Sequence, residues 1–179
     1  MHGPVWSGNV FINDIYFHDN SQVNTLFDIE SSHPIINGCI LTNNSVESNL
    51  VRFSQRSLAT VNNFIASDNT SYSAFSINGA NSSPQLENII IAGNTGLGVD
   101  IGSGDNLSLT FNNALIFKNT GGAGIITNGP ITLSNLSVIG NNQELSEYGA
   151  GGFTITQSGA LNLIQSNIFN NGTALYNNN

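Results

Sequence analysis

The sequence predicts an all-β fold, a right-handed single-stranded parallel β-helix of about seven coils with three short strands each. Three observations support this prediction: a repeat of 22 to 30 residues, apolar side chains that step by two and by three within each repeat, and abundant turn-forming residues, with 30 Asn and 19 Gly in 179 residues. No segment sustains the 3.6-residue period of a helix, which argues against a helical repeat. We expect residues 1–179 to form a single β-helix segment excised from a longer solenoid.

A column of asparagines defines the repeat. It consists of Asn20, Asn44, Asn69, Asn94, Asn119, Asn141 and Asn171. Apolar residues recur eight, five and three positions before each asparagine, with one polar exception, Ser166. The column at eight positions before is Ile12, Ile36, Val61, Leu86, Phe111, Leu133 and Leu163. We expect these columns to stack inside the solenoid, where an Asn amide can both donate and accept hydrogen bonds between coils.

The spacing within a repeat predicts where strands end and corners begin. In the first repeat, Val10 and Ile12 are two residues apart, Ile12 and Ile15 three, and Ile15 and Phe17 two. A step of two is typical of a strand, so the step of three indicates a corner between two strands. The second corner residue is mostly of a type that tolerates a left-handed backbone: Asp14, Gly38, Asn63, Asn88, Asn113, Asn135 and Gln165. A third strand follows the Asn column in each repeat.

The pattern resembles the right-handed β-helix repeats of pectate-lyase-like proteins and of autotransporter passengers over nearly the whole chain. Phe17 with Asn20 matches the Phe-x-x-Asn motif of polymorphic outer-membrane protein repeats. The segments 121–125 (GGAGI) and 151–153 (GGF) are variants of the Gly-Gly-Ala-aliphatic motif of the same repeats. This resemblance implies a non-catalytic surface or adhesion module, located outside the cell or on its surface.

Composition limits the partners and the chemistry. Three basic and eleven acidic residues give a net charge of −8, so we expect no nucleic-acid partner, which would need clustered cations. Cys39 is the only cysteine and falls in an apolar column, which predicts a small buried hydrophobe. No metal site or cofactor is predicted. Asn13 and Asp14 interrupt the first apolar stretch, so we expect neither a signal peptide nor a membrane-spanning segment in this chain.

The first candidate site is the outward row of the third strand. It is expected to contain Asp28, Arg52, Ser76, Asp100, Ile126 and Thr154. In pectate-lyase-like enzymes the corresponding face carries the catalytic or metal-binding acids and an arginine, so the resemblance makes Asp28, Glu30, Arg52 and Asp100 the candidates for polysaccharide binding or cleavage. Asp28 and Glu30 would lie about 7 Å apart, whereas Asp100 would lie about 14 Å from Asp28, too far to act with it. The alternative is a solvated face with an Asp28–Arg52 ion pair worth under ~1 kcal/mol, and we assign no catalytic residue.

The second candidate site is an apolar row at the outward position of the second strand, where a solvated face should be polar. The row consists of Tyr16, Ile40, Ile65, Ile90 and Leu115. A stripe of several hundred Å² predicts a protein partner, a covering segment or self-association. The long loop between Asn141 and Gly151 is a further candidate for recognition, through Glu144, Glu147 and Tyr148.

Three functions therefore remain open from the sequence: a surface or adhesion module, a polysaccharide-binding or polysaccharide-cleaving domain, and a filament subunit that stacks coil ends.

Overall fold

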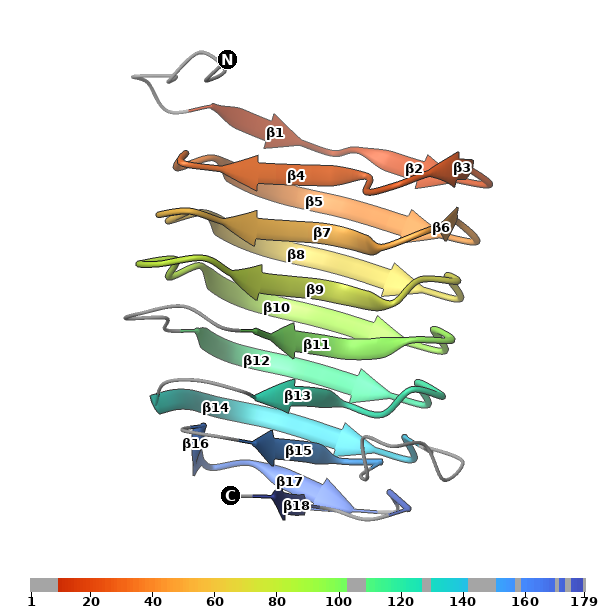
Figure 1. Ribbon diagram of the computed structural model, residues 1–179. Helices are drawn as coiled ribbons and strands as arrows, with labels where there is room; N and C mark the ends of the chain where they lie inside the picture. The colour runs from red at the N-terminus through yellow and green to blue at the C-terminus, as the bar shows by residue number, and fades with distance from the viewer. Residues whose placement is uncertain are drawn as a thin grey trace.

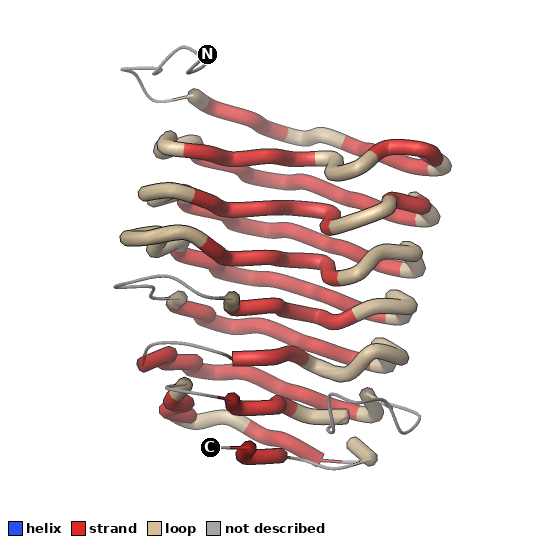
Figure 2. Tube along the Cα trace, viewed as in Figure 1, coloured by secondary structure: helices blue, strands red, loops and turns tan. Residues whose placement is uncertain are grey.

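The chain forms a parallel β-solenoid with strands stacked along one axis and no helix among the described residues (Figures 1 and 2). The computed structural model describes residues 10–102, 109–126, 130–141, 151–156, 159–169, 171–172 and 175–178. All strand pairs given for these residues are parallel. The predicted fold class is thus confirmed. The solenoid comprises about five turns rather than the seven expected, because the outermost units contribute only short strands.

Two sheets form the front and rear layers in Figure 1. The first sheet consists of β1 (Phe11–Asn13), β2 (Tyr16–His18), β5 (Ile35–Thr42), β8 (Thr60–Ser67), β10 (Gln85–Ala92), β12 (Thr110–Phe117), β14 (Pro130–Ile139), β16 (Ala160–Ile164) and β17 (Asn167–Phe169). The second sheet consists of β4 (Phe27–Glu30), β7 (Asn49–Ser54), β9 (Ser73–Asn78), β11 (Leu97–Ile101), β13 (Gly124–Ile126), β15 (Phe153–Thr156) and β18 (Leu175–Asn178). A small sheet pairs β3 (Ser21–Val23) with β6 (Ser45–Val46).

The predicted corner in the first sheet exists, but it does not separate two strands in the central turns. All seven residues predicted at the corner have positive φ, from Gln165 at 50° to Gly38 at 69°. Strands β5, β8, β10, β12 and β14 nevertheless run through this corner, because the pairing with the next coil resumes immediately after it. The first two expected strands are separate only at the ends, as β1 and β2 and as β16 and β17.

The core lies between the two sheets and contains the predicted apolar columns. Ile36, Val61, Leu86, Phe111 and Leu133 are paired in register and are almost completely buried. Ile12 and Leu163, at the two ends of this column, are partly buried and pack against the core. Side chains from both sheets meet there, since Phe75 of β9 contacts Phe64 of β8 with ring centroids 5.0 Å apart. The predicted inward stacking is therefore confirmed.

Cys39 occupies this core as predicted. Its thiol is fully buried, and burial raises its pKa to about 12. Because the thiolate is the reactive form, this cysteine has a structural role as a small hydrophobe.

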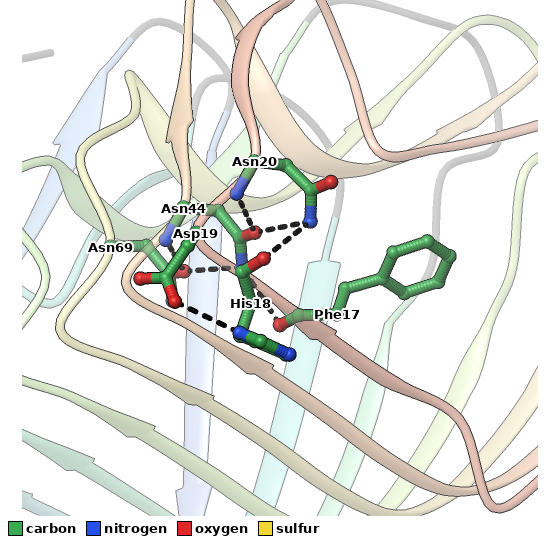
Figure 3. A network of polar contacts seen from close by, with 6 residues as sticks. All are labelled: Phe17, His18, Asp19, Asn20, Asn44 and Asn69. Atoms are coloured by element: carbon green, nitrogen blue, oxygen red, sulfur yellow. Dashed lines mark hydrogen bonds and ion pairs between the residues drawn. The ribbon is translucent and has the colours of Figure 1, made fainter.

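The interior asparagine ladder is the column of seven asparagines predicted from the repeat, and its amides connect successive coils (Figure 3). The Oδ1 atom of Asn94 accepts from both the backbone N–H and the Nδ2 group of Asn69, each at 3.0 Å. The Nδ2 group of Asn94 donates to the Ala66 carbonyl at 3.0 Å and to Asn119 Oδ1 at 2.9 Å. One side chain thus bonds both neighbouring coils, which satisfies a buried amide completely.

One register prediction was wrong by a single residue. Gly124 and Ile126 pair with Val99 and Ile101, so the backbone partner of Asp100 is Ile125, not Ile126. The shift follows from packing, because a Cβ on Gly124 would lie 2.6 Å from the Val99 carbonyl oxygen and 3.1 Å from the Phe153 ring. Glycine at this inward position leaves room for Phe153 in the next coil.

Candidate functional site

The polar row on the second sheet is formed by register pairs. Asp28 pairs with Arg52, Arg52 with Ser76, and Ser76 with Asp100. Asp28 and Asp100 are therefore three strand spacings apart, as the sequence predicted. At about 4.8 Å per spacing they cannot share one substrate bond.

Arg52 and Asp28 form the predicted ion pair. Arg52 Nε donates to Asp28 Oδ1 at 2.9 Å, and a second guanidinium N–H donates to Oδ2. The hydrogen bond to Asp28 raises the pKa of Arg52; burial opposes this, and the charges of Asp28 and Glu30 add to it. Both partners are partly exposed, so the pair contributes about 1 kcal/mol or less. Glu30 is exposed near them on β4.

Asp100 is the unusual member of the polar row. Burial raises the pKa of its carboxyl from 3.8 to about 6, while its row neighbour Ser76 is almost completely buried. A perturbed carboxyl is a feature of many catalytic sites, but such sites also need partners for the reaction. Within the described residues, no group of three or more His, Cys, Asp or Glu side chains could hold a metal ion. The row brings Asp28, Glu30 and Arg52 together and leaves Asp100 apart.

The raised pKa of Asp100 gives a testable pH dependence. Because the carboxylate is disfavoured in the folded state, the protein is expected to lose stability as pH rises from about 4 through about 6. Replacing Asp100 with Asn should remove this loss and raise the free energy of unfolding at pH 7 by about 1–3 kcal/mol, with little gain at pH 4. Denaturant unfolding at both pH values measures the difference, with Glu47→Gln as the control at an exposed carboxyl. An equal effect of Asp100→Asn at both pH values would contradict this assignment.

The apolar row on the first sheet is present as predicted. Tyr16 pairs with Ile40, Ile40 with Ile65, Ile65 with Ile90, and Ile90 with Leu115. Tyr16 is 59 % exposed, Ile40 39 % and Ile90 38 %, while Ile65 and Leu115 are partly exposed. Register pairing therefore aligns five apolar side chains on five successive strands.

The apolar row belongs to a wider surface, which we call the outer face of the first sheet. Four rows of outward residues make it up: Phe11, Ile35, Thr60, Gln85, Thr110, Thr132 and Asn162; Asn13, Asn37, Asn62, Glu87, Asn112, Ser134 and Ile164; Tyr16, Ile40, Ile65, Ile90, Leu115, Ser137 and Asn167; His18, Thr42, Ser67, Ala92, Phe117, Ile139 and Phe169. Most of the exposed large hydrophobic residues in the described part of the chain lie here: Phe11, Tyr16, Ile40, Ile90, Ile164 and Phe169. Val10, Leu58 and Tyr72 lie elsewhere.

The outer face of the first sheet also has almost no charge. At its described strand positions the His, Asp, Glu, Lys and Arg side chains are His18 and Glu87. The second sheet carries Asp28, Glu30, Arg52 and Asp100 by contrast. Sequence reasoning found the apolar row but missed this charge distribution, which could have been seen by comparing all outward positions of the repeat.

A shallow cavity at the corner that follows β4, β7 and β9 was also not predicted. It has a volume of about 260 Å³ and is lined by Ser31, Gln55, Arg56 and Ala80. Its lining takes part in hydrogen bonds between coils, because Ser31 Oγ donates to the Gln55 carbonyl at 2.8 Å and Arg56 N–H donates to the Ala80 carbonyl at 3.1 Å. The successive positive φ angles of Gln55 and Arg56 shape this corner, and no residue type there indicates them in the sequence.

The third predicted recognition element, Glu144, Glu147 and Tyr148, lies outside the described residues.

Comparison with known proteins does not assign the chain to a family. No protein-family model, curated protein or solved structure matches the chain. In the described part of the chain there is also no helix long and apolar enough to cross a membrane.

Proposed function

We propose that this chain is a non-catalytic extracellular surface or adhesion module, in which a rigid β-solenoid presents the outer face of its first sheet to a partner protein. The observation that carries the proposal is the register-paired apolar row on a face whose described strand positions include one acidic side chain, Glu87. Exposed apolar patches of several hundred Å² occur mainly at binding sites. The likeness of the repeat to autotransporter passengers supports a location outside the cell.

The interior of the solenoid supports the same proposal. Every hydrogen bond of the Asn94 side chain joins one coil to another, so the ladder fixes the stacking of the coils. A surface supported in this way changes shape little on binding, which lowers the entropic cost of association. A rigid scaffold is what a display module requires.

A polysaccharide-binding or polysaccharide-cleaving domain is the second candidate. The observation in its favour is the polar row, where the Asp28–Arg52 pair lies beside Glu30 and where Asp100 carries a raised pKa. Arg52 already has both oxygens of Asp28 as partners, which reduces its capacity to bind a sugar carboxylate. The row therefore supports catalysis less well than the outer face of the first sheet supports protein binding.

The proposal is tested by incubating the full chain with acidic polysaccharides, with and without calcium. We expect no release of reducing or unsaturated sugar ends above that from a heat-denatured sample. Turnover that is lost in Arg52→Ala or Asp28→Asn, and retained in the control Glu47→Gln, would overturn the non-catalytic assignment. This control removes an exposed carboxylate outside the polar row.

A further inference from the structure

We propose that the partner of the outer face of the first sheet is a second copy of this chain, bound face to face in a symmetric dimer. This inference rests on the proposed function, because it names the protein that the face binds. The net charge of the chain and the area of the face both favour a second copy as the partner.

Charge favours self-association through this face over contact through the second sheet. The chain has a net charge of −8, so two copies repel each other unless their contact avoids the acidic residues. The second sheet presents Asp28, Glu30 and Asp100, and the corners of the first sheet present Asp14, Asp19 and Asp68. At the strand positions of the first sheet, Glu87 is the one acidic side chain among the described residues. Asp14 stands beside Gly38 of β5, at the corner between β1 and β2, so two such faces meet with two carboxylates each, Glu87 and Asp14.

The area of the face is sufficient for a stable dimer. Strands β5, β8, β10 and β12 each contain eight residues, which at about 3.3 Å per residue gives a width of about 26 Å. The path of the sheet contains seven strands and so six spacings, which at about 4.8 Å each give a length of about 29 Å. The product is roughly 750 Å², close to the roughly 800 Å² that each partner contributes to a standard protein interface.

The rows of the face suit a symmetric contact. A two-fold contact brings the same patch of both copies together, so a row near the two-fold axis packs against itself. Residues of the apolar row stand one strand spacing apart over five strands, so side chains of one copy can fit between those of the other. Asn and Thr side chains of the adjacent rows supply donors and acceptors around this apolar centre.

The test is sedimentation equilibrium of the full chain at several concentrations at pH 7. We expect a monomer–dimer equilibrium, and the variant Ile65→Asp with Ile90→Asp should weaken it by at least about 100-fold, because four carboxylates would be buried in the contact. The control Leu58→Asp with Tyr72→Asp adds the same charge at two hydrophobic residues outside the face, both 48 % exposed, and should change the dissociation constant by less than about 3-fold. Glu87→Gln should strengthen the dimer several-fold.

Circular dichroism and thermal unfolding of dilute samples verify that each variant is folded. A wild-type chain that stays monomeric at all concentrations would overturn the dimer, as would equal weakening by the control pair. Either result leaves the proposed function unchanged, with a different protein as the partner. The proposed function is overturned only by polysaccharide turnover that depends on Arg52 or Asp28. If the Ile65→Asp and Ile90→Asp variant does not fold, the Glu87→Gln variant still tests the dimer. An unchanged dissociation constant for Glu87→Gln would contradict a contact through this face.

Discussion

Replacement of Asn94 by Ala is expected to lower the free energy of unfolding by about 3–6 kcal/mol, which is enough to unfold a marginally stable domain. The substitution leaves two buried donors without their acceptor, Asn69 N–H and one N–H of Asn69 Nδ2. Asn119 Oδ1 loses one of its two donors, the Nδ2 group of Asn94. It also removes the donor to the Ala66 carbonyl. Denaturant unfolding followed by circular dichroism measures the change.

The control for Asn94 is an exposed asparagine in a similar chain of amides. Asn88 accepts from Asn113 Nδ2 and donates to Asn63 Oδ1, but all three side chains are exposed. Asn88→Gly preserves the positive φ of this corner and should cost under about 1 kcal/mol, because water replaces the lost partners. An equal loss in the free energy of unfolding for Asn94→Ala and Asn88→Gly would show that the interior asparagine ladder does not hold the coils together.

Replacement of Phe75 by Ala is expected to cost about 3–5 kcal/mol, since it opens a cavity where the two sheets meet. Phe75 is fully buried and contacts the rings of Phe53, Phe64 and Phe111 at centroid distances of 5.9, 5.0 and 6.5 Å. Unfolding in denaturant, in the same buffer as for the Asn94 variants, gives the comparison. Loss of this ring should also loosen the contact between β8, β9 and β12.

Phe11→Ala is the matched control for Phe75, because Phe11 is 61 % exposed on the outer face of the first sheet. At concentrations where the chain is monomeric, this variant should lose under about 1 kcal/mol. A cost at Phe11 as large as that at Phe75 would mean that the core does not lie between the two sheets.

The repeat predicted the fold because each structural role in the solenoid requires one kind of residue. Interior positions need apolar side chains or a self-complementary amide, and the corner needs a residue that tolerates positive φ. Asp14, Gly38 and Gln165 differ in chemistry but all have positive φ, so position in the repeat was a better guide than residue type. Residue type alone does not predict positive φ, because Lys118, at a second corner of the repeat, has a φ of 53°.

The parts that the sequence did not predict depend on contacts between coils. The one-residue register shift at Gly124 follows from the size of Phe153, which lies in the next coil. The partial burial of Asp100 depends in the same way on its surroundings in the folded chain. The apolar row could be predicted, since it needs only the alternation within a strand, whereas the lack of charge on the face needs all four rows to be aligned.

Hydroxyl-radical footprinting across a concentration series tests most directly whether the outer face of the first sheet is the binding surface. We expect Tyr16, Ile40 and Ile90 to become protected as concentration rises through the dimerisation range, while Leu58 and Tyr72 stay equally reactive. Protection of Leu58 and Tyr72, with Tyr16, Ile40 and Ile90 unchanged, would contradict it.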